Sequence, residues 1–152
     1  MKERAMAIFI GLIMVLSTVG FAVNRSSIFS AEQSQENPLS KTYVINRSLA
    51  SDEKIYVLRT GRVIIENFYT ENCSVCEKNK EVMESFAEKF KDYVLLENVL
   101  NNETISIKMI GRGGEIEKFE NASALNLTED MLMEKFCDIA LLQPRECLLR
   151  EI

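Results

Sequence analysis

The sequence predicts an α/β domain, and its central region carries the observations behind that prediction. Residues 63–69 form an apolar and aromatic run, bounded by Gly61 and by polar residues, as in a buried strand. Residues 93–96 form a second continuous apolar run. Between the two, apolar residues recur at helical spacing: Val82, Met83, Phe86, Ala87 and Phe90. A strand, a helix and a strand in this order predict a right-handed parallel crossover.

Two cysteines, Cys73 and Cys76, stand where the first strand meets the helix. At a helix N-terminus, unpaired N–H groups and the positive end of the dipole favour a thiolate, which is the species that attacks disulfides. The second thiol, one turn along, can displace the first from a mixed disulfide. The pair is a candidate redox site in which Cys73 attacks and Cys76 resolves. The same spacing also occurs in half of a zinc site and in small structural disulfides.

A strand, a short turn, CxxC and an amphipathic helix together resemble the thioredoxin family, over roughly residues 55–142. The resemblance implies a reduced thioredoxin-like α/β fold with the order β, CxxC, α, β, β, β, α. One helix is missing because residues 101–103 cannot hold the crossover helix that the family places there. The resemblance further implies a thiol–disulfide oxidoreductase that acts on protein thiols or disulfides without a cofactor.

Four positions depart from the pattern of that family. The buried acid that thioredoxins carry six residues before the first cysteine is Asn67 here, which cannot take a proton. Where the family has a cis-proline ahead of the hairpin, this chain has Thr104. Between the cysteines it has Ser74 and Val75 in place of the residues usual in the family. These departures weaken the expectation of a fast reductase and leave slow exchange, oxidation or a specialised partner open.

Proton transfer at Cys76 is also constrained, because the chain contains no histidine. Water, Glu66 or Glu71 must then accept the proton of the resolving thiol. Strand alternation places Glu66 on the face opposite Asn67. An ordinary solvated or strand-end carboxylate at Glu66 is therefore at least as good an interpretation as a catalytic one.

The remaining elements follow from shorter patterns. Residues 43–45 and 55–58 are both strand-like, and we expect one of them to be the outer strand beside residues 63–69. Residues 104–110 and 115–119, joined by a glycine-rich turn, predict a β-hairpin. A final helix is expected to start at Thr128, whose hydroxyl can cap it, and to end before Pro144.

The N-terminus predicts a membrane segment. Residues 5–23 contain no charge and follow Lys2 and Arg4, and about 20 apolar residues suffice to cross a bilayer as a helix. The positive-inside rule then places the rest of the chain outside the cytoplasm. A cleaved signal peptide, which would release a secreted protein, is the alternative. Residues 24–41 read as a polar linker and residues 42–152 as the domain, within reach of an integral-membrane electron-transfer partner.

Charge and asparagine usage describe the surface. The formal net charge of −5 gives no indication of nucleic-acid binding. Six of the asparagines begin an N-x-Ser/Thr sequon, whereas chance predicts about one. They are Asn24, Asn46, Asn72, Asn102, Asn121 and Asn126. Either the surface is exported and glycosylated, or these residue types simply collect in turns. Asn72 is expected to stay unmodified, since a glycan there would cover the redox site.

Two further cysteines, Cys137 and Cys147, flank the helix break at Pro144. A chain that folds back there would bring them close enough for a structural disulfide, and such bonds persist in exported domains. Two free thiols, an electron relay to the CxxC and a four-cysteine zinc site are the alternatives. The two candidate functions are therefore a membrane-tethered oxidoreductase and a non-catalytic thioredoxin-like binding module with structural disulfides or zinc.

Overall fold

The computed structural model describes residues 38–150, which are built around one mixed β-sheet of five strands. In chain order the elements are η1 (Pro38–Ser40), β1 (Val44–Ile45), α2 (Ser51–Arg59), β2 (Val63–Tyr69), α3 (Ser74–Lys89), β3 (Val94–Leu100), β4 (Ser106–Ile110), β5 (Ile116–Phe119), α4 (Glu129–Ile139) and α5 (Arg145–Leu148). The predicted membrane segment, residues 5–23, lies outside the described residues. Within residues 38–150, no helix combines the length and the apolar character that a bilayer crossing needs.

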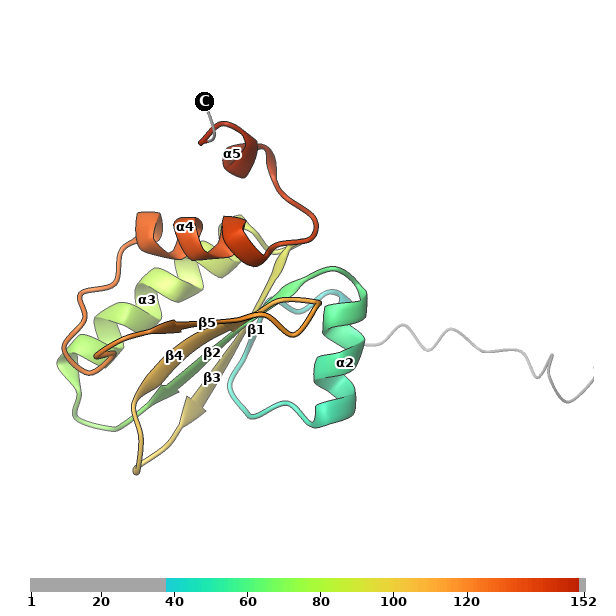
Figure 1. Ribbon diagram of the computed structural model, residues 1–152. Coiled ribbons are helices and arrows are strands. Elements are labelled where there is room, and N and C mark those ends of the chain that lie inside the picture. The colour runs from blue at the N-terminus through green and yellow to red at the C-terminus, as the bar shows by residue number, and fades with distance from the viewer. Residues whose placement is uncertain (1–37, 151–152) are drawn as a thin grey trace, which may run out of the picture. The chain divides into compact units, whose positions relative to one another are not determined.

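The strands lie in the order β1-β3-β2-β4-β5, with β2 at the centre (Figure 1). β1, β3 and β2 run parallel, β4 runs antiparallel to β2, and β5 runs antiparallel to β4. The predicted crossover from β2 through α3 to β3 and the predicted hairpin of β4 and β5 are both present. The chain passes from β3 to β4 without a helix, as the short spacing required.

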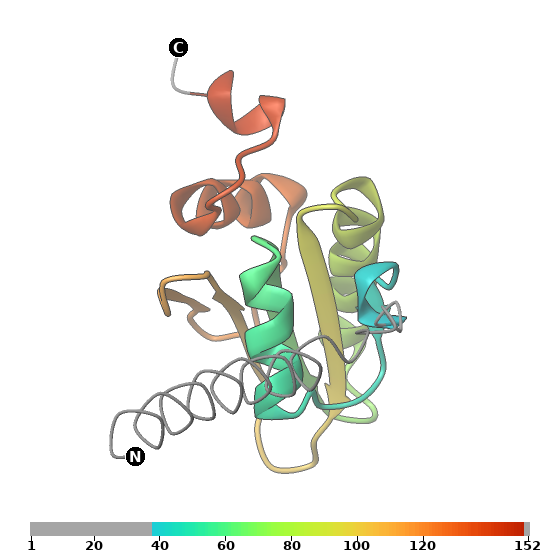
Figure 2. The same ribbon diagram turned by 90° about the vertical axis from the view of Figure 1, so that its right-hand side faces the viewer.

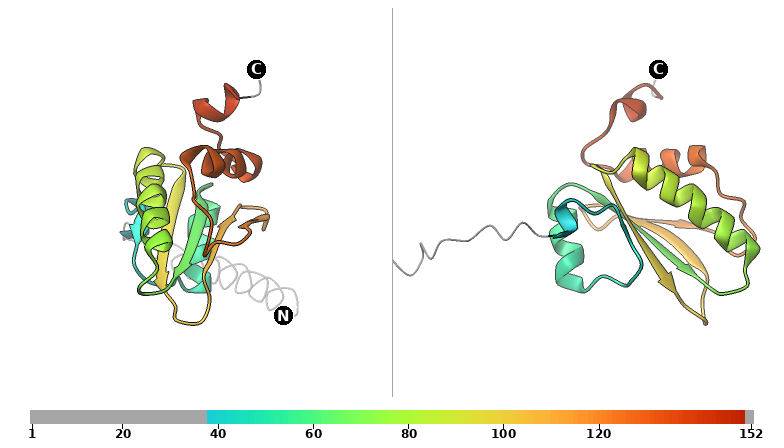
Figure 3. Two further views of the ribbon diagram at one scale, coloured as in Figure 1. Left: turned by 90° about the vertical axis from the view of Figure 1, so that its left-hand side faces the viewer. Right: turned by 180° about the vertical axis from the view of Figure 1, so that it is seen from behind.

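Helices cover both faces of the sheet. α3 and α4 pack on one face and α2 on the other, as the views from both sides and from behind show (Figure 2, Figure 3). Strand alternation divides the apolar side chains accordingly. Ile65 and Leu96 join the core under α3 and α4, whereas their neighbours Ile64 and Leu95 join the smaller core under α2. Because both faces are covered, β2 and β3 are buried over most of their length.

The segment 55–58 forms part of helix α2, so the outer strand is β1. The strand propensity of these residues is outweighed by strong signals for a helix start just before them. The Ala50 N–H donates to the Glu53 carboxylate at 2.9 Å, and Asp52 and Glu53 place negative charge in the first turn. The expectation that the outer strand lies beside β2 was also wrong. β1 pairs with β3, because the crossover inserts β3 between them.

Helix α4 begins at the predicted cap. The Met131 N–H donates to Thr128 Oγ1 at 3.3 Å, and the flanking leucines Leu127 and Leu132 are both buried. The helix ends at Ile139, ahead of Pro144. Strand β4 begins at Ser106, so Thr104 lies in the β3–β4 connection.

A buried arginine attaches the N-terminal edge of the described region. Arg62 donates to the carbonyl oxygens of Leu39 at 2.9 Å, Thr42 at 2.7 Å and Val94 at 2.6 Å. Leu39 is itself buried beside α2. Residues 38–42 are thereby held against the start of β3, which fixes β1 as the edge strand.

Candidate redox site

The two cysteines of the CxxC motif lie at the start of α3, where β2 delivers them. Cys73 is the N-cap of the helix, and the Cys76 N–H donates to its sulfur at 3.1 Å. The two residues are joined by a disulfide. Cys76 is only 3% exposed, whereas Cys73 is partly exposed. An incoming thiolate can therefore reach Cys73 Sγ, and Cys76 is the buried partner.

Asn72 turns the chain into this helix. Its φ of 62° lies in the left-handed region, which asparagine tolerates better than most residues with a side chain. The turn directs the connection after Tyr69 back over the sheet, so that α3 starts at the end of the central strand. The backbone conformation therefore accounts for an asparagine at this position, whether or not its sequon is glycosylated.

Asn67 belongs to a buried chain of amides under α3. It is 2% exposed, and its Nδ2 donates to Asn98 Oδ1 at 2.9 Å. Asn98 Nδ2 in turn donates to Glu84 Oε1 at 3.1 Å, on the exposed side of α3. Asn67 and Asn98 are register partners on β2 and β3. Neither amide can accept a proton, so the sheet supplies no buried base to the thiols.

Glu66 points to the opposite face and is not the solvated carboxylate that the sequence suggested. It is 1% exposed, and its oxygens lie 2.5 Å from Lys54 Nζ and 2.6 Å from Lys108 Nζ. Its register partner Glu97 is 0% exposed, with Lys54 Nζ at 3.5 Å. Two carboxylates and two ammonium groups thus form an ionic cluster beneath α2. The alternation of β2 separates this cluster from Cys76, so Glu66 has a structural role.

Opposing effects act on the pKa of Glu66. Burial raises it, but the ammonium groups of Lys108 and Lys54 together lower it by more, so the net pKa lies below the ordinary value. Burial likewise lowers the pKa of Lys54, while the carboxylates of Glu66 and Glu97 raise it to a net value above the ordinary one. Both pKa shifts favour the charged forms of the Glu66 and Lys54 pair.

Thr104 occupies the loop between β3 and β4 and is exposed. Its Oγ1 accepts a hydrogen bond from Asn101 Nδ2 at 3.1 Å, and the Glu103 N–H donates to Asn101 Oδ1 at 2.9 Å. All peptide bonds in residues 38–150 are trans. The loop therefore closes on itself through Asn101, in the place where the resemblance would put a cis-proline.

Asn79 is a site residue that the sequence analysis did not single out. It is 2% exposed and clamps the β5–α4 connection to the first turns of α3. Its Nδ2 donates to the Leu125 carbonyl at 2.8 Å, and the Leu127 N–H donates to its Oδ1 at 3.0 Å. The signal was a polar residue in register with Cys76 and Met83 on the apolar face of the helix. The connection is thus held beside the CxxC.

Cys137 and Cys147 form the second disulfide and fix α5 beyond α4. Cys147 is buried. Phe136, which precedes Cys137, contacts the rings of Phe86 and Phe90, with ring centroids 5.7 Å and 5.8 Å from its own. Those rings belong to the C-terminal end of α3, roughly 20 Å along the helix from the CxxC at about 1.5 Å per residue. The four sulfurs form two separate pairs. In residues 38–150, no three His, Cys, Asp or Glu side chains are grouped to hold a metal ion.

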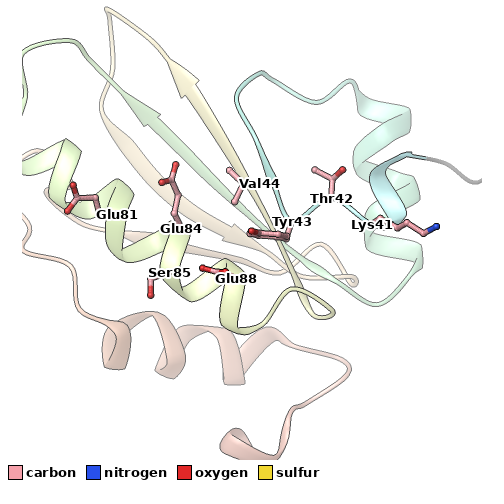
Figure 4. A pocket seen from close by; sticks show the side chains of 8 residues that line it. All are labelled: Lys41, Thr42, Tyr43, Val44, Glu81, Glu84, Ser85 and Glu88. Carbon is pink, nitrogen blue, oxygen red and sulfur yellow. The ribbon is translucent and has the colours of Figure 1, made fainter.

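A cavity of about 760 Å³ lies away from the cysteines, between the edge strand and the middle of α3 (Figure 4). Residues 41–44 form one wall, and Glu81, Glu84, Ser85 and Glu88 form the other. The wall of α3 is acidic. Neither Cys73 nor Cys76 lines this cavity.

No protein-family profile and no curated protein matches the sequence. Solved structures that are similar to it include a thioredoxin variant from Halobacterium salinarum NRC-1, with 16% identity over 69% of this chain and 96% of that one, at a TM-score of 0.49. Fasciola hepatica thioredoxin has 21% identity over 64% and 99% of the chains (TM-score 0.46). The first thioredoxin domain of mouse protein disulfide-isomerase A4 has 14% identity over 77% and 94% (TM-score 0.47).

The architecture of the chain itself assigns the fold. A parallel β2–α3–β3 crossover lies at the centre of a β1-β3-β2-β4-β5 sheet, and an antiparallel hairpin completes the sheet. The CxxC stands at the junction of the central strand and the helix. With these features, and without a helix between β3 and β4, the chain has a thioredoxin-like fold.

Proposed function

We propose that this protein is a thiol–disulfide oxidoreductase whose redox group is the Cys73–Cys76 pair. The observation that carries the proposal is the asymmetry of the pair: Cys73 is the partly exposed N-cap of α3, and Cys76 is buried behind it. A structural staple has no need of an accessible sulfur at a helix N-terminus. That position stabilises a thiolate when the bond is broken.

The exchange proceeds in two balanced steps. In the reduced protein, the Cys73 thiolate attacks one sulfur of a protein disulfide, and the other sulfur leaves with the bonding electrons and takes a proton from water. Cys76 then loses its proton and attacks Cys73 Sγ, which breaks the mixed disulfide and releases the second substrate thiol. The substrate gains two electrons and the CxxC becomes a disulfide. In the reverse direction, a substrate dithiol attacks Cys73 Sγ and is oxidised.

Deprotonation of Cys76 is the step at which this site differs from one with a buried acid. Asn67 donates its amide hydrogen to Asn98 and offers no basic group. Glu66 lies across the sheet in its ionic cluster. Water or the exposed Glu71 must therefore accept the proton from Cys76, so we expect resolution to be slower than attack.

The proposal includes a location, supported by the sequence of residues 1–37. Residues 5–23 anchor the chain with Lys2 and Arg4 in the cytoplasm, and the folded domain lies outside. The polar stretch 24–41 stands between this segment and the domain in the sequence. The redox site then faces partners at the membrane surface, including an integral-membrane electron donor or acceptor.

A trapping experiment tests the chemistry. Full-length Cys76→Ser protein in membranes should accumulate reductant-sensitive mixed disulfides on Cys73, because attack continues while resolution stops. The matched control is the double variant Cys73→Ser with Cys76→Ser, which should capture nothing. If the single variant captures no more than the double variant, the pair is a structural staple and the domain is a binding module.

A separate experiment tests the location. After an alkaline carbonate wash, the mature protein should remain in the membrane fraction and should retain its first residues. Release of a chain that begins after residue 22 would show cleavage and a secreted protein. This result would leave the trapping outcome unaffected.

A further inference from the structure

Most of the described sequons lie at one edge of the sheet. Asn72 follows β2 and Asn102 follows β3, and these parallel strands end together at Tyr69 and Leu100. Asn46 follows β1, which ends earlier, level with Glu97 in the middle of β3. β5 runs parallel to β2 through two antiparallel pairings, so Asn121 after β5 lies at this edge as well. Asn126 lies in the same connection, which Asn79 holds to the first turns of α3. The loops after β2, β3 and β5 lie at the end of the sheet where α3 begins (Figure 1).

Exposure separates these asparagines from the others. All five are exposed, and so is the Ser or Thr two residues after each one. Among the described asparagines outside sequons, Asn67, Asn79 and Asn98 are buried and hydrogen-bonded, and Asn101 is bonded within its loop. If asparagine merely collected in turns, the exposed ones would not all coincide with sequons.

Two of the five have a backbone explanation, and three do not. Asn72 and Asn121 have φ values of 62° and 54°, a conformation that favours asparagine over most other residues. The side chains of Asn46, Asn102 and Asn126 make no hydrogen bond to any residue in the described part of the chain. Their amides are exposed to solvent and available for reaction.

We propose that Asn46, Asn102 and Asn126 carry N-linked oligosaccharides, and that those at Asn102 and Asn126 form a collar beside the CxxC edge. Transfer of an oligosaccharide to asparagine requires a lipid-phosphate-linked oligosaccharide as donor and a transferase that uses it, both outside the cytoplasm. The asparagine nitrogen forms a bond to the anomeric carbon, the lipid phosphate leaves with the bonding electrons, and the amide proton passes to a base of the transferase. The inference rests on the extracytoplasmic location proposed above.

The collar has a consequence for the choice of partner. Sugars at Asn102 and Asn126 stand on the loops after β3 and before α4, on either side of the partly exposed Cys73. They exclude broad folded surfaces and admit a flexible peptide segment. Asn72 stays unmodified, since Cys73 follows it directly and Ser74 is already in the helix.

Mass spectrometry of the full chain from its native membranes tests the inference. Peptides that contain Asn46, Asn102 or Asn126 should exceed their sequence mass by a sugar increment that fragments as hexose-type losses. Ser48→Ala, which destroys the first sequon, should remove the increment at Asn46, and Ser48→Thr, which keeps it, should not. Asn101→Gln, beside Asn102 but outside a sequon, should leave every increment in place.

The opposite result is three unmodified peptides at the masses of their sequences, which overturns the inference. A second experiment distinguishes a wrong collar from a wrong location. Whole cells are treated with a mild reductant and a membrane-impermeant maleimide. If the reagent labels Cys73 while the peptides are unmodified, the collar alone is wrong. If it labels nothing and the peptides are unmodified, the proposed location is wrong as well. The trapping experiment on Cys76→Ser is independent of both results.

Discussion

Asn67 on β2 and Asn98 on β3 are register partners, and the Nδ2 of Asn67 donates to the Oδ1 of Asn98 at 2.9 Å beneath α3. The bond satisfies two buried amides without introducing a charge. Since Asn98 also donates to Glu84 at 3.1 Å, the chain of amides leads from the sheet to the exposed side of the helix. A pair of amides therefore stands beneath α3 where a buried acid would supply a base, and for this reason we expect the resolving step to be slow.

Asn67→Asp should accelerate the resolving step. A carboxylate at this position can accept the proton of Cys76, and burial will keep its pKa above that of an exposed aspartate. A positioned general base contributes about 10²-fold or more when proton transfer limits the rate. Single-turnover release from a mixed disulfide on Cys73 measures the effect. Asn67→Leu, which offers no base, is the control, and equal rates for the two variants would show that proton removal does not limit resolution.

Lys54→Met should destabilise the domain by about 3 kcal/mol, since it leaves the buried Glu97 carboxylate without its nearest cation. Glu66 keeps Lys108 at 2.6 Å, so the loss falls mainly on Glu97. Adding Glu97→Gln should restore part of the stability, because the amide removes the uncompensated charge. Urea unfolding of the domain measures both effects. A double variant no more stable than Lys54→Met would contradict this account of the cluster.

Acid should weaken the fold through Glu66. Because its pKa in the folded state lies below its unfolded value of about 4.3, the charged pairs add stability above that pH. This stability is lost as the pH falls through the lower, folded pKa. Urea midpoints between pH 7 and pH 3 should therefore fall more steeply for the native chain than for Glu66→Gln. Parallel curves would show that Glu66 titrates alike in both states.

Asn79→Leu should loosen the connection between β5 and α4. The substitution removes the partners of the Leu125 carbonyl and the Leu127 N–H, and an unpaired buried backbone group costs about 1–3 kcal/mol. Amide hydrogen exchange at Leu127 should become faster. The amides of β3 should still exchange only through global unfolding. Unchanged protection of the Leu127 amide would mean that the connection is held by other contacts.

The sequence predicted the centre of the fold because its patterns there are local. Val63–Tyr69, the CxxC and the helical face of α3 each appear within a few residues, and the short spacing after β3 excluded a crossover helix. The run 55–58 was ambiguous because its strand propensity competes with a helix start that depends on Glu53 and Ala50. The position of β1 followed from the crossover and could not be read from its own two residues.

The contacts of the buried polar residues were less predictable, because the sequence of one strand does not show which residues of the neighbouring strand lie opposite it. Glu66 looks like a surface residue until Lys54 and Lys108 are brought to it from α2 and β4. Asn98 gains its role only through its register with Asn67. The gathering of the sequons likewise required the strand directions, since their positions in the sequence are far apart.

The titration of Cys73 tests the central claim most directly. In reduced Cys76→Ser protein, the rate of alkylation of Cys73 should rise with a midpoint clearly below pH 8.5, which is about the value for an ordinary thiol, because the N-terminus of α3 stabilises the thiolate. The same protein unfolded in urea provides the reference. A midpoint at or above that of the unfolded thiol, with no faster alkylation at pH 7, would contradict the assignment of Cys73 as the attacking group.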